Sequence, residues 1–235
     1  MRRVFLDTET TGLDARGGDR IVEVGCVEMI GRRLSGRRLH RYVNPERPVP
    51  IEAQRIHGLG DAFLADKPKF ADIASELAEF LAGAELLIHN ADFDLGFLDA
   101  EFARLDMPPA RACCASVVDT MKMARDLRPG KRNSLDALCA EYGIDNSERD
   151  FHGALLDAEL LADVWLAMTR GQESLLIDTA PVLPAATLPL PAGDRPPLRV
   201  LVAAEDELVE HRRLLEDIQR ASRGKCLWLG GSEAG

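Results

Sequence analysis

Short apolar runs recur along the first 120 residues, and each has the length and pattern of a β-strand. They lie at residues 4–6, 21–27, 34–43, 86–88 and 117–118. The second run alternates apolar and polar positions, which is typical of a strand with one covered face. A turn at Gly31-Arg32-Arg33 connects it to the third run, and such a short connection favours antiparallel pairing.

Four further segments carry apolar residues at the spacing of a helix that packs on one side. They cover residues 73–81, 93–105, 134–142 and 154–168. Because strand-like runs and helical segments are interleaved along the chain, residues 1–170 are predicted to form one α/β domain with helices packed against a sheet.

The composition changes near residue 170. Six of the 13 prolines fall between residues 181 and 197, so residues 171–197 are predicted to contain an extended linker. Residues 198–235 form a third segment, with an apolar run at 198–202 and a helical pattern over 204–220. About 38 residues cannot bury much of a core alone. This segment is therefore expected to dock on a partner, and a frayed tail is the alternative.

The overall composition excludes several classes of protein. Of the 235 residues, 46% are hydrophobic and 29% charged, which excludes a fully disordered or collagenous chain. No apolar run has the ~18–20 residues of a membrane span, and the acid at position 7 comes too early for a signal peptide. The five cysteines form no CxxC pair, which argues against a disulfide scaffold or zinc ribbon. We therefore expect a cytoplasmic location.

The formal net charge is −10, from 29 basic and 39 acidic side chains. Such a chain is not expected to bind nucleic acid tightly through its overall charge, so a metal ion or a partner protein would have to recruit it. Five arginines at positions 32, 33, 37, 38 and 41 form a local basic patch. Their alternation on a predicted edge strand favours protection of that edge over nucleic-acid binding.

Asp7 and Glu9 follow the first apolar run directly. In a strand, residues two apart project from the same face, so both carboxylates point to one place. Two such charges repel each other unless a cation lies between them. The alternative is that residues 7–12 form a solvated turn.

Asp94 has a similar setting, just after the apolar run at 86–88. An acid in the first helical turn often caps the helix. Asp92 is better placed for that role, which leaves Asp94 available for other chemistry. Asp99 and Glu101, farther along the same predicted helix, have the pattern of solvated acids.

His152 and Asp157 open the last helical segment of the domain. Asp157 is bracketed by Leu155-Leu156 and Leu160-Leu161, so it lies on or beside an apolar helix face. A buried acid is unfavourable unless it is paired or bound to metal. A lone histidine such as His152 is, in isolation, more often a surface or core residue than a catalytic one.

Together these residues suggest a metal centre. Carboxylate oxygens are the ligands that Mg²⁺ and Mn²⁺ prefer, and two such ions ~4 Å apart can stabilise the attacking and leaving oxygens of a phosphodiester displacement. A neutral histidine beside them can take a proton from water near pH 7. The chemistry therefore points to hydrolysis of a phosphodiester bond.

Three segments resemble the three motifs of the DEDDh 3′–5′ exonuclease family. They lie at residues 7–12, 89–94 and 152–157. Residues 129–139 and 142–146, and the Cys226-Leu227-Trp228 ending, further resemble the proofreading subunits of bacterial DNA polymerase III. The resemblance covers nearly the whole chain.

This resemblance implies an RNase H-like exonuclease fold, with a mixed five-stranded sheet flanked by helices. It also implies that Asp7, Glu9, Asp94 and Asp157 hold two divalent metal ions, Mg²⁺ or Mn²⁺, and that His152 is the general base. Glu52 and His57 would reach the terminal nucleotide from a loop before the first long helix. The implied substrate-binding residues are Asp7, Glu9, Thr11, Gly12, Leu13, Glu52, His57 and Asp157.

The same resemblance implies binding partners. Gln172, Leu175, Leu176 and Ile177 fit a sliding-clamp peptide, with isoleucine where an aromatic residue is usual, so the clamp affinity is expected to be weak. Residues 198–235 resemble the part that binds the polymerase catalytic (alpha) subunit. Some relatives also bind a small third core subunit through the catalytic domain.

The implied activity is removal of mispaired 3′-terminal nucleotides from DNA as nucleoside 5′-monophosphates. Two alternatives remain at the level of sequence. One is a stand-alone relative that trims RNA or short oligonucleotides. The other is a scaffold subunit whose main role is to join polymerase to clamp.

Overall fold

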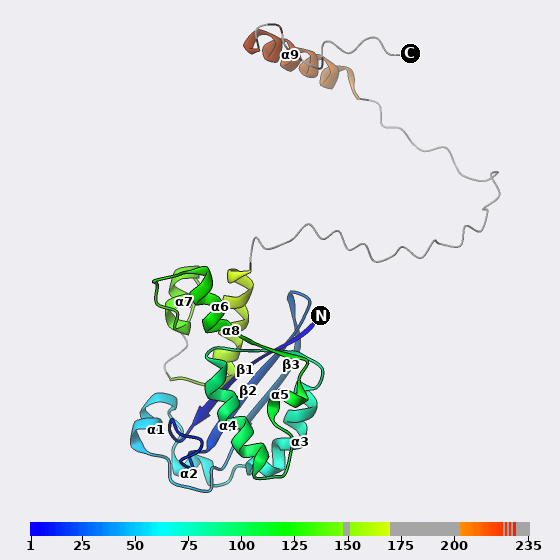
Figure 1. Ribbon diagram of the computed structural model, residues 1–235. Coiled ribbons are helices and arrows are strands. Elements are labelled where there is room, and N and C mark those ends of the chain that lie inside the picture. The colour runs from blue at the N-terminus through cyan, green and yellow to red at the C-terminus, as the bar shows by residue number, and fades with distance from the viewer. Residues whose placement is uncertain (148–150, 170–202, 223, 225, 227, 229–235) are drawn as a thin grey trace, which may run out of the picture. The chain divides into compact units, whose positions relative to one another are not determined.

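A computed structural model of the chain describes residues 1–147, 151–169, 203–222, 224, 226 and 228 (Figure 1). The chain divides into two units, residues 1–176 and 177–235. The predicted linker at 171–197 lies outside the described residues. The predicted α/β domain, residues 1–170, falls within the first unit.

A five-stranded mixed sheet forms the centre of the first unit. Its strands are β1 (Arg2–Thr10), β2 (Ile21–Ile30), β3 (Arg33–Tyr42), β4 (Glu85–Ile88) and β5 (Ser116–Asp119). They are ordered β3-β2-β1-β4-β5. The pairs β1–β2 and β2–β3 are antiparallel, whereas β1–β4 and β4–β5 are parallel. The predicted sheet and its antiparallel hairpin are therefore confirmed.

The eight helices described in this unit include all four predicted ones. They are α1 (Ile51–His57), α2 (Asp61–Leu64), α3 (Phe70–Leu81), α4 (Ala91–Ala103), α5 (Ala110–Cys113), α6 (Thr120–Leu127), α7 (Leu135–Tyr142) and α8 (Ala154–Met168). The segment expected to be a loop around Glu52 and His57 is helix α1, so that expectation was wrong. Helix α6 was also not predicted, although the carboxylate of Asp119 caps it by accepting from the N–H groups of Met121 and Lys122.

Two hydrophobic clusters lie on opposite faces of the sheet. On one face, Val4 and Leu6 of β1 belong to a cluster with residues of α3 and α4. On the other face, Phe5 belongs to a cluster with Leu161 and Trp165 of α8, and the Phe5 and Trp165 rings meet edge to face at 5.8 Å. Because β1 is covered on both faces, its residues 4–6 are apolar at consecutive positions rather than at alternate ones.

The start of α8 lies directly against the backbone of β2. Gly25 of β2 pairs with Asp7 of β1. A Cβ atom added at Gly25 would lie 2.2 Å from the carbonyl carbon of Ala154 and 2.3 Å from the amide nitrogen of Leu155. Only a residue without a side chain permits this approach, so Gly25 determines how closely the first turn of α8 approaches Asp7.

β3 is an edge strand, and three of its four arginines pair with acids within the protein. Arg37 pairs with Glu28, Arg41 with Glu76 and Arg38 with Glu159. Arg32 donates to the carbonyl of Leu166 and to the hydroxyl of Thr169. These contacts agree with the interpretation of the patch as edge protection.

Glu101 differs from its prediction as a solvated acid. It is 2% exposed and forms two hydrogen bonds of 2.6 and 2.8 Å with the guanidinium of Arg20. Asp99 accepts a hydrogen bond from the backbone N–H of Ala110. Sequence position alone did not indicate these partners, because Arg20 lies 81 residues from Glu101 and Ala110 lies 11 residues from Asp99, beyond the next helix turn.

In the second unit, helix α9 (Glu205–Ala221) confirms the helical pattern predicted for residues 204–220. None of its residues is buried, and Leu208, Val209 and Leu214 are exposed. Among the helices that the structure describes, none combines the length and the apolar character required to cross a bilayer.

Replacing Gly25 with alanine tests the contact between α8 and the sheet. We expect the Gly25→Ala variant to lose about 1–3 kcal/mol of unfolding free energy, because the added methyl group overlaps backbone atoms that cannot move aside locally. Gly96→Ala is the matched control, since an added Cβ in the middle of α4 meets nothing within 4 Å. That control should be neutral or stabilising by about 0.5–1 kcal/mol. Urea denaturation measures the unfolding free energy of both variants. Equal unfolding free energies for Gly25→Ala and Gly96→Ala would contradict the packing argument.

Candidate active site

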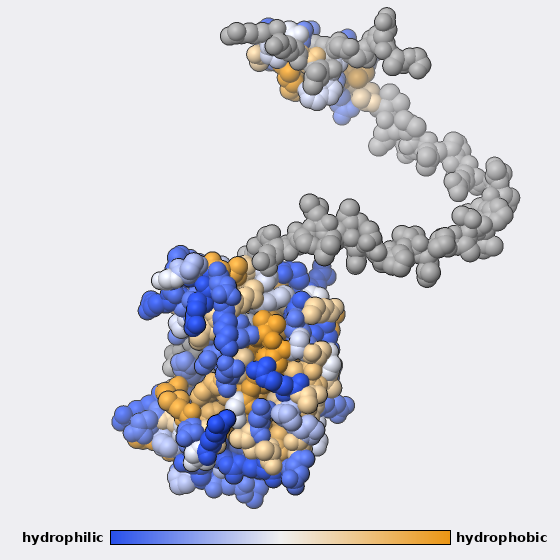
Figure 2. Space-filling model, viewed as in Figure 1, coloured by the Kyte–Doolittle hydropathy of each residue, from blue (hydrophilic) through white to orange (hydrophobic). Residues whose placement is uncertain are grey.

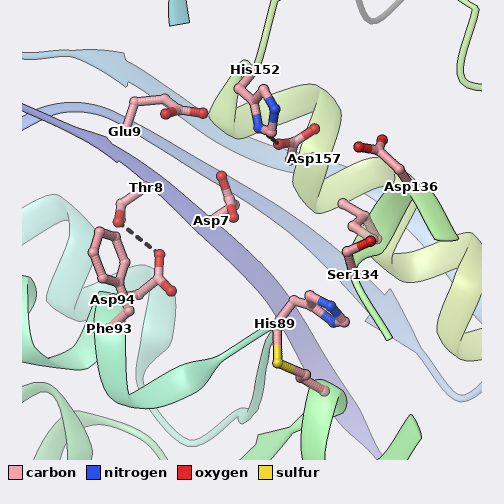
Figure 3. A pocket seen from close by; sticks show the side chains of 12 residues that line it. Asp7, Thr8, Glu9, His89, Phe93, Asp94, Ser134, Asp136, His152 and Asp157 are labelled. Atoms are coloured by element: carbon pink, nitrogen blue, oxygen red, sulfur yellow. Dashed lines mark hydrogen bonds and ion pairs between the residues drawn. The ribbon is translucent and has the colours of Figure 1, made fainter. Parts of the chain in front are cut away.

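A cavity of about 270 Å³ opens where β1 and β4 end (Figure 3). It contains the acids and the histidine singled out in the three sequence segments, although they come from distant parts of the chain. The cavity is lined by Asp7, Thr8, Glu9, His89, Phe93, Asp94, Met121, Ser134, Leu135, Asp136, His152 and Asp157.

Asp7 and Glu9 project from the face of β1 that α8 covers, and Asp157 lies in the first turn of α8. Figure 3 shows their carboxylates directed into one space, with the His152 ring above Asp157. Glu9 is 9% exposed and Asp157 only 3% exposed. The fold therefore concentrates negative charge in a place where water stabilises it poorly.

Ligand atoms of Glu9, His152 and Asp157 all lie within 4.8 Å of one another. The Nδ1 atom of His152 is 3.5 Å from Oδ2 of Asp157. Hard carboxylate oxygens that converge in this way suit a divalent cation such as Mg²⁺ or Mn²⁺. The residues present therefore fit a metal site.

Asp94 approaches the same cavity from the opposite face of β1. It is 3% exposed, and its Oδ1 atom accepts a hydrogen bond of 2.7 Å from the hydroxyl of Thr8. Burial raises the pKa of Asp94 to about 7, and the hydrogen bond from Thr8 opposes that shift. A nearby cation would favour the charged form of this carboxyl group.

Asp92 does not cap α4, so the sequence-based prediction for this residue was wrong. Asn90 occupies the cap position, with a left-handed backbone and no side-chain hydrogen bond to the helix. Asp92 instead pairs with Lys122 at 2.8 Å and with Arg111 at 3.5 Å. Its charge is satisfied by basic residues on neighbouring helices.

The backbone next to His152 is fastened to α1. The N–H group of His152 donates a hydrogen bond of 3.0 Å to the carbonyl oxygen of Ile56. The imidazole itself is 47% exposed. The side chain is therefore open to solvent, whereas the main chain that carries it is held in place.

A second cavity, of about 440 Å³, adjoins the first and shares Thr8, Glu9 and Phe93 with it. It brings together the remaining residues that the family resemblance assigned to substrate binding. They are Thr11, Gly12, Leu13, Glu52 and His57. The predicted substrate residues thus fall in two adjoining cavities, and their roles remain predictions.

Several of these residues differ in how accessible they are. Leu13 is 86% exposed, whereas Thr11 is fully buried and its hydroxyl donates to Asp19. His57 is 5% exposed, and its Nδ1 atom accepts from the N–H of Leu59. Burial lowers the pKa of His57, which favours the neutral ring, while the nearby Glu23 carboxylate opposes the shift.

The sequence did not indicate some residues that line the first cavity. His89 follows β4, and its Nε2 atom, 2.8 Å from the carbonyl oxygen of Asn133, must donate because a carbonyl only accepts. Ser134 caps α7 by accepting from the N–H of Ala137, and this places Asp136 at the cavity. In the sequence, a serine directly before an apolar helical pattern was the signal that could have indicated this helix cap. The predicted clamp residues 172–177 lie outside the described residues.

The fold and these cavities define a carboxylate-lined centre on an α/β domain, and known proteins identify its class. A family model described as "Exonuclease" matches residues 4–165. DNA polymerase III subunit epsilon of Salmonella typhimurium strain LT2 is 48% identical over 237 residues, which covers 97% of each chain. The Escherichia coli K12 protein of the same name is 47% identical with the same coverage. The solved structure of exonuclease X in complex with 5′-overhanging duplex DNA has a TM-score of 0.57 and 27% identity, and the match covers 72% of this chain and 92% of that one.

The chain therefore belongs to the exonuclease family and, within it, to the group formed by the epsilon subunits of DNA polymerase III. It is a 3′–5′ exonuclease with the RNase H-like fold of that family. The possible metal site in its first cavity agrees with the divalent-metal dependence typical of the family.

The buried carboxyl group of Asp94 should make the stability of the metal-free protein depend on pH. An unfolded aspartate has a pKa of about 3.9, whereas Asp94 in the folded protein has a pKa of about 7. Between these values the folded state holds a proton that the unfolded state has lost, so the free energy of unfolding falls as pH rises from about 4 to about 7. Asp94→Asn removes this dependence. Relative to wild type, the variant should gain about 2–4 kcal/mol between pH 4 and pH 8.

Urea denaturation in the presence of a chelator measures this difference. Asp92→Asn is a matched control, because Asp92 is an exposed acid of the same helix turn. Parallel pH profiles for wild type and Asp94→Asn would show that the Asp94 carboxyl group titrates normally.

Proposed function

We propose that this exonuclease proofreads DNA synthesis by hydrolysing the 3′-terminal phosphodiester bond of a single-stranded or frayed, mispaired end. The products are a nucleoside 5′-monophosphate and a strand with a new 3′-hydroxyl group. The observation that carries the proposal is the convergence of Glu9, His152 and Asp157 in a cavity that also contains Asp7 and Asp94. A purely scaffolding role gives no reason for so many buried acids in one place.

Asp7, Glu9, Asp94 and Asp157 would hold two divalent ions, Mg²⁺ or Mn²⁺. When bound, such ions supply positive charge that stabilises the attacking and leaving oxygens of the displacement. With their charge compensated in this way, the carboxylates would repel the polyanionic substrate less.

His152 would be the general base. Its Nδ1 atom faces Asp157, which favours the tautomer with a proton on Nδ1, and Nε2 is then the nitrogen that accepts a proton from water. The water oxygen forms a bond to the terminal phosphorus, the bond from phosphorus to the 3′-oxygen of the preceding nucleotide breaks, and that oxygen takes a proton from solvent to become the new 3′-hydroxyl group. The exposure of the imidazole lets the proton pass on to solvent.

The second cavity would hold the terminal nucleoside. Leu13, Ile56 and Phe93 give it an apolar lining, and Glu52 and His57 add polar groups at its α1 side. Apolar side chains can stack on any base and carry no hydrogen-bond pattern that reads one. A pocket of this kind suits an enzyme that must accept all four terminal nucleotides, and Thr11 and Gly12 would form its backbone wall.

The partners follow the three-part organisation, with residues 1–170 as the exonuclease domain. Residues 198–235 would bind the polymerase catalytic subunit, and the exposure of Leu208, Val209 and Leu214 on α9 supports this role. Residues 172–177, within the segment 171–197, would bind the sliding clamp. Both contacts would raise the effective DNA concentration for an acidic enzyme, and the complex would act in the cytoplasm.

Digestion of a single strand labelled at its 3′ end, beside a copy labelled at its 5′ end, tests the catalytic assignments. With Mg²⁺ or Mn²⁺, the wild type should release labelled mononucleotide first from the 3′ end. Asp7→Ala and Asp157→Ala should abolish release while the protein remains folded. His152→Ala should lower kcat by about 10²- to 10⁴-fold and leave metal binding intact, as measured by titration calorimetry. Full turnover in His152→Ala would reject the general-base assignment.

Two variants of the full chain test the partner assignments, and each controls for the other. Deletion of residues 198–235 should abolish binding to the polymerase catalytic subunit and leave clamp binding unchanged. The double variant Leu175→Ala, Leu176→Ala should weaken clamp binding and leave polymerase binding unchanged. Surface plasmon resonance with each partner measures both, and activity on a free single strand should persist throughout. If the deletion variant still bound the polymerase subunit, the docking role of 198–235 would be wrong.

A further inference from the structure

A third cavity, of about 370 Å³, lies at the connection between α6 and α7, outside the two cavities described above. Its lining is unusual for this acidic chain, because basic side chains predominate. The residues are Arg128, Lys131, Arg132, Ala137, Ala140 and Glu141. In Figure 2 the surface over α6 and α7 is predominantly hydrophilic.

The cavity has more positive than negative charge. Its three cations face one carboxylate, that of Glu141, which accepts from Lys131 at 2.7 Å and pairs with Arg128 at 3.2 Å. Arg132 is exposed and makes no hydrogen bond or ion pair with any residue that the structure describes. Together Lys131 and Arg128 lower the pKa of Glu141, as expected where positive charge predominates.

Arg128 has unused hydrogen-bonding capacity. Its side chain is only 10% exposed and lies 5.7 Å from the centre of the Tyr142 ring. Within the described part of the chain, its buried Nε and Nη1 atoms have no acceptor. A buried donor without an acceptor is unfavourable. An anion in the cavity would supply acceptors that a rotation of the guanidinium could reach, and Lys131 and Arg132 would complete its coordination.

The cavity also lies next to the catalytic cavity along the chain. Ser134, Leu135 and Asp136 line the catalytic cavity, and the following residue, Ala137, lines the basic one. The hydrogen bond from His89 to the carbonyl of Asn133 ties the connecting segment to the end of β4. The segment that leads from the basic cavity into α7 is therefore tied to the end of β4, which borders the catalytic cavity.

The three cavities are arranged in an order that fits a strand. In Figure 1, α1 and the pair α6–α7 lie at opposite ends of the first unit. The cavity beside α1 shares residues with the catalytic cavity, and neighbouring residues of α7 line the catalytic cavity and the basic one. A strand with its terminal nucleoside beside α1 and its scissile bond at the carboxylates would continue toward α7.

We propose that Arg128, Lys131 and Arg132 bind a backbone phosphate of the DNA strand upstream of the scissile bond. This inference rests on the proposed function, because that function supplies the direction of the strand. Arginine and lysine side chains bind phosphate oxygens without reading the base. Such a contact would hold a DNA strand of any base sequence. It would also attract the DNA backbone locally, which the negative net charge of the chain does not do.

Kinetics of the full chain with two substrates test the proposal. One substrate is a single-stranded oligonucleotide, and the other is the p-nitrophenyl ester of thymidine 5′-monophosphate, which has no upstream strand. The variant Lys131→Gln, Arg132→Gln should lower kcat/KM for the oligonucleotide by about 5- to 30-fold, mostly through KM. Its kcat/KM for the ester should stay within about twofold of wild type, because loss of upstream contacts does not affect that substrate.

Arg33→Gln, Arg38→Gln is the matched control, since it removes two exposed arginines from the edge strand β3. It should leave both substrates unaffected. The slope of log kcat/KM against log salt should fall by about 0.7 for the Lys131, Arg132 variant, as expected when about one phosphate charge is no longer neutralised on a single strand. The control should retain the wild-type slope.

Substrates with one uncharged methylphosphonate linkage locate the contact. In wild type, a methylphosphonate at one upstream linkage should raise KM. The same substitution should have no further effect on KM in the Lys131, Arg132 variant. Unchanged oligonucleotide kinetics in the variant would overturn the proposal, and so would an equal loss on the ester, which would indicate a structural role. If wild type hydrolysed neither substrate, the proposed function itself would fail, and this inference with it.

Discussion

The close approach of α8 to β2 at Gly25 is the contact on which the candidate active site depends. Asp7 and Glu9 belong to the first strand, whereas His152 and Asp157 lie about 150 residues later in the chain. They meet because the backbone at Ala154 occupies the space where any other residue at position 25 would place its side chain. Since Gly25 pairs with Asp7, this contact sets the first turn of α8 directly over the first carboxylate. The hydrophobic cluster that includes Phe5, Leu161 and Trp165 then holds the rest of the helix in register.

The protein stabilises its buried acids in two different ways. Glu28 and Glu101 are each bound by arginine side chains, and the pairing with Ser35, Arg2 and Arg37 lowers the pKa of Glu28 despite its burial. Asp94 receives only hydrogen bonds, and burial raises its pKa instead. Acids of the first kind are structural, because their charge is already balanced by the protein. An acid of the second kind retains a capacity to bind a cation, and this difference distinguishes Asp94, a proposed metal ligand, from the framework acids.

The sequence predicted the sheet and the main helices because their hydrophobic periodicity is strong. It failed where the structure is determined by contacts between distant residues. Residues 51–57 have no apolar stripe long enough to predict a helix, yet α1 forms, and the carbonyl of Ile56 in that helix accepts from His152. The burial of Glu101 depends on Arg20, and no local pattern links the two. The acids of the site were found because each follows an apolar run. The pairing of Asp92 with Lys122 was missed because it joins two helices.

The dependence of the site on α8 also has a consequence for the synthesis of the protein. A ribosome makes Asp7 and Glu9 first, and it makes Asp157 only after the whole sheet has emerged. Helix α8 covers strands that are far from it in sequence, so its contacts with the sheet are long-range and can form only after residues 154–168 have been made. A chain that ends before residue 152 therefore carries three of the four carboxylates, Asp7, Glu9 and Asp94, and lacks both His152 and Asp157. The site is therefore complete only once the last helix of the domain has been made.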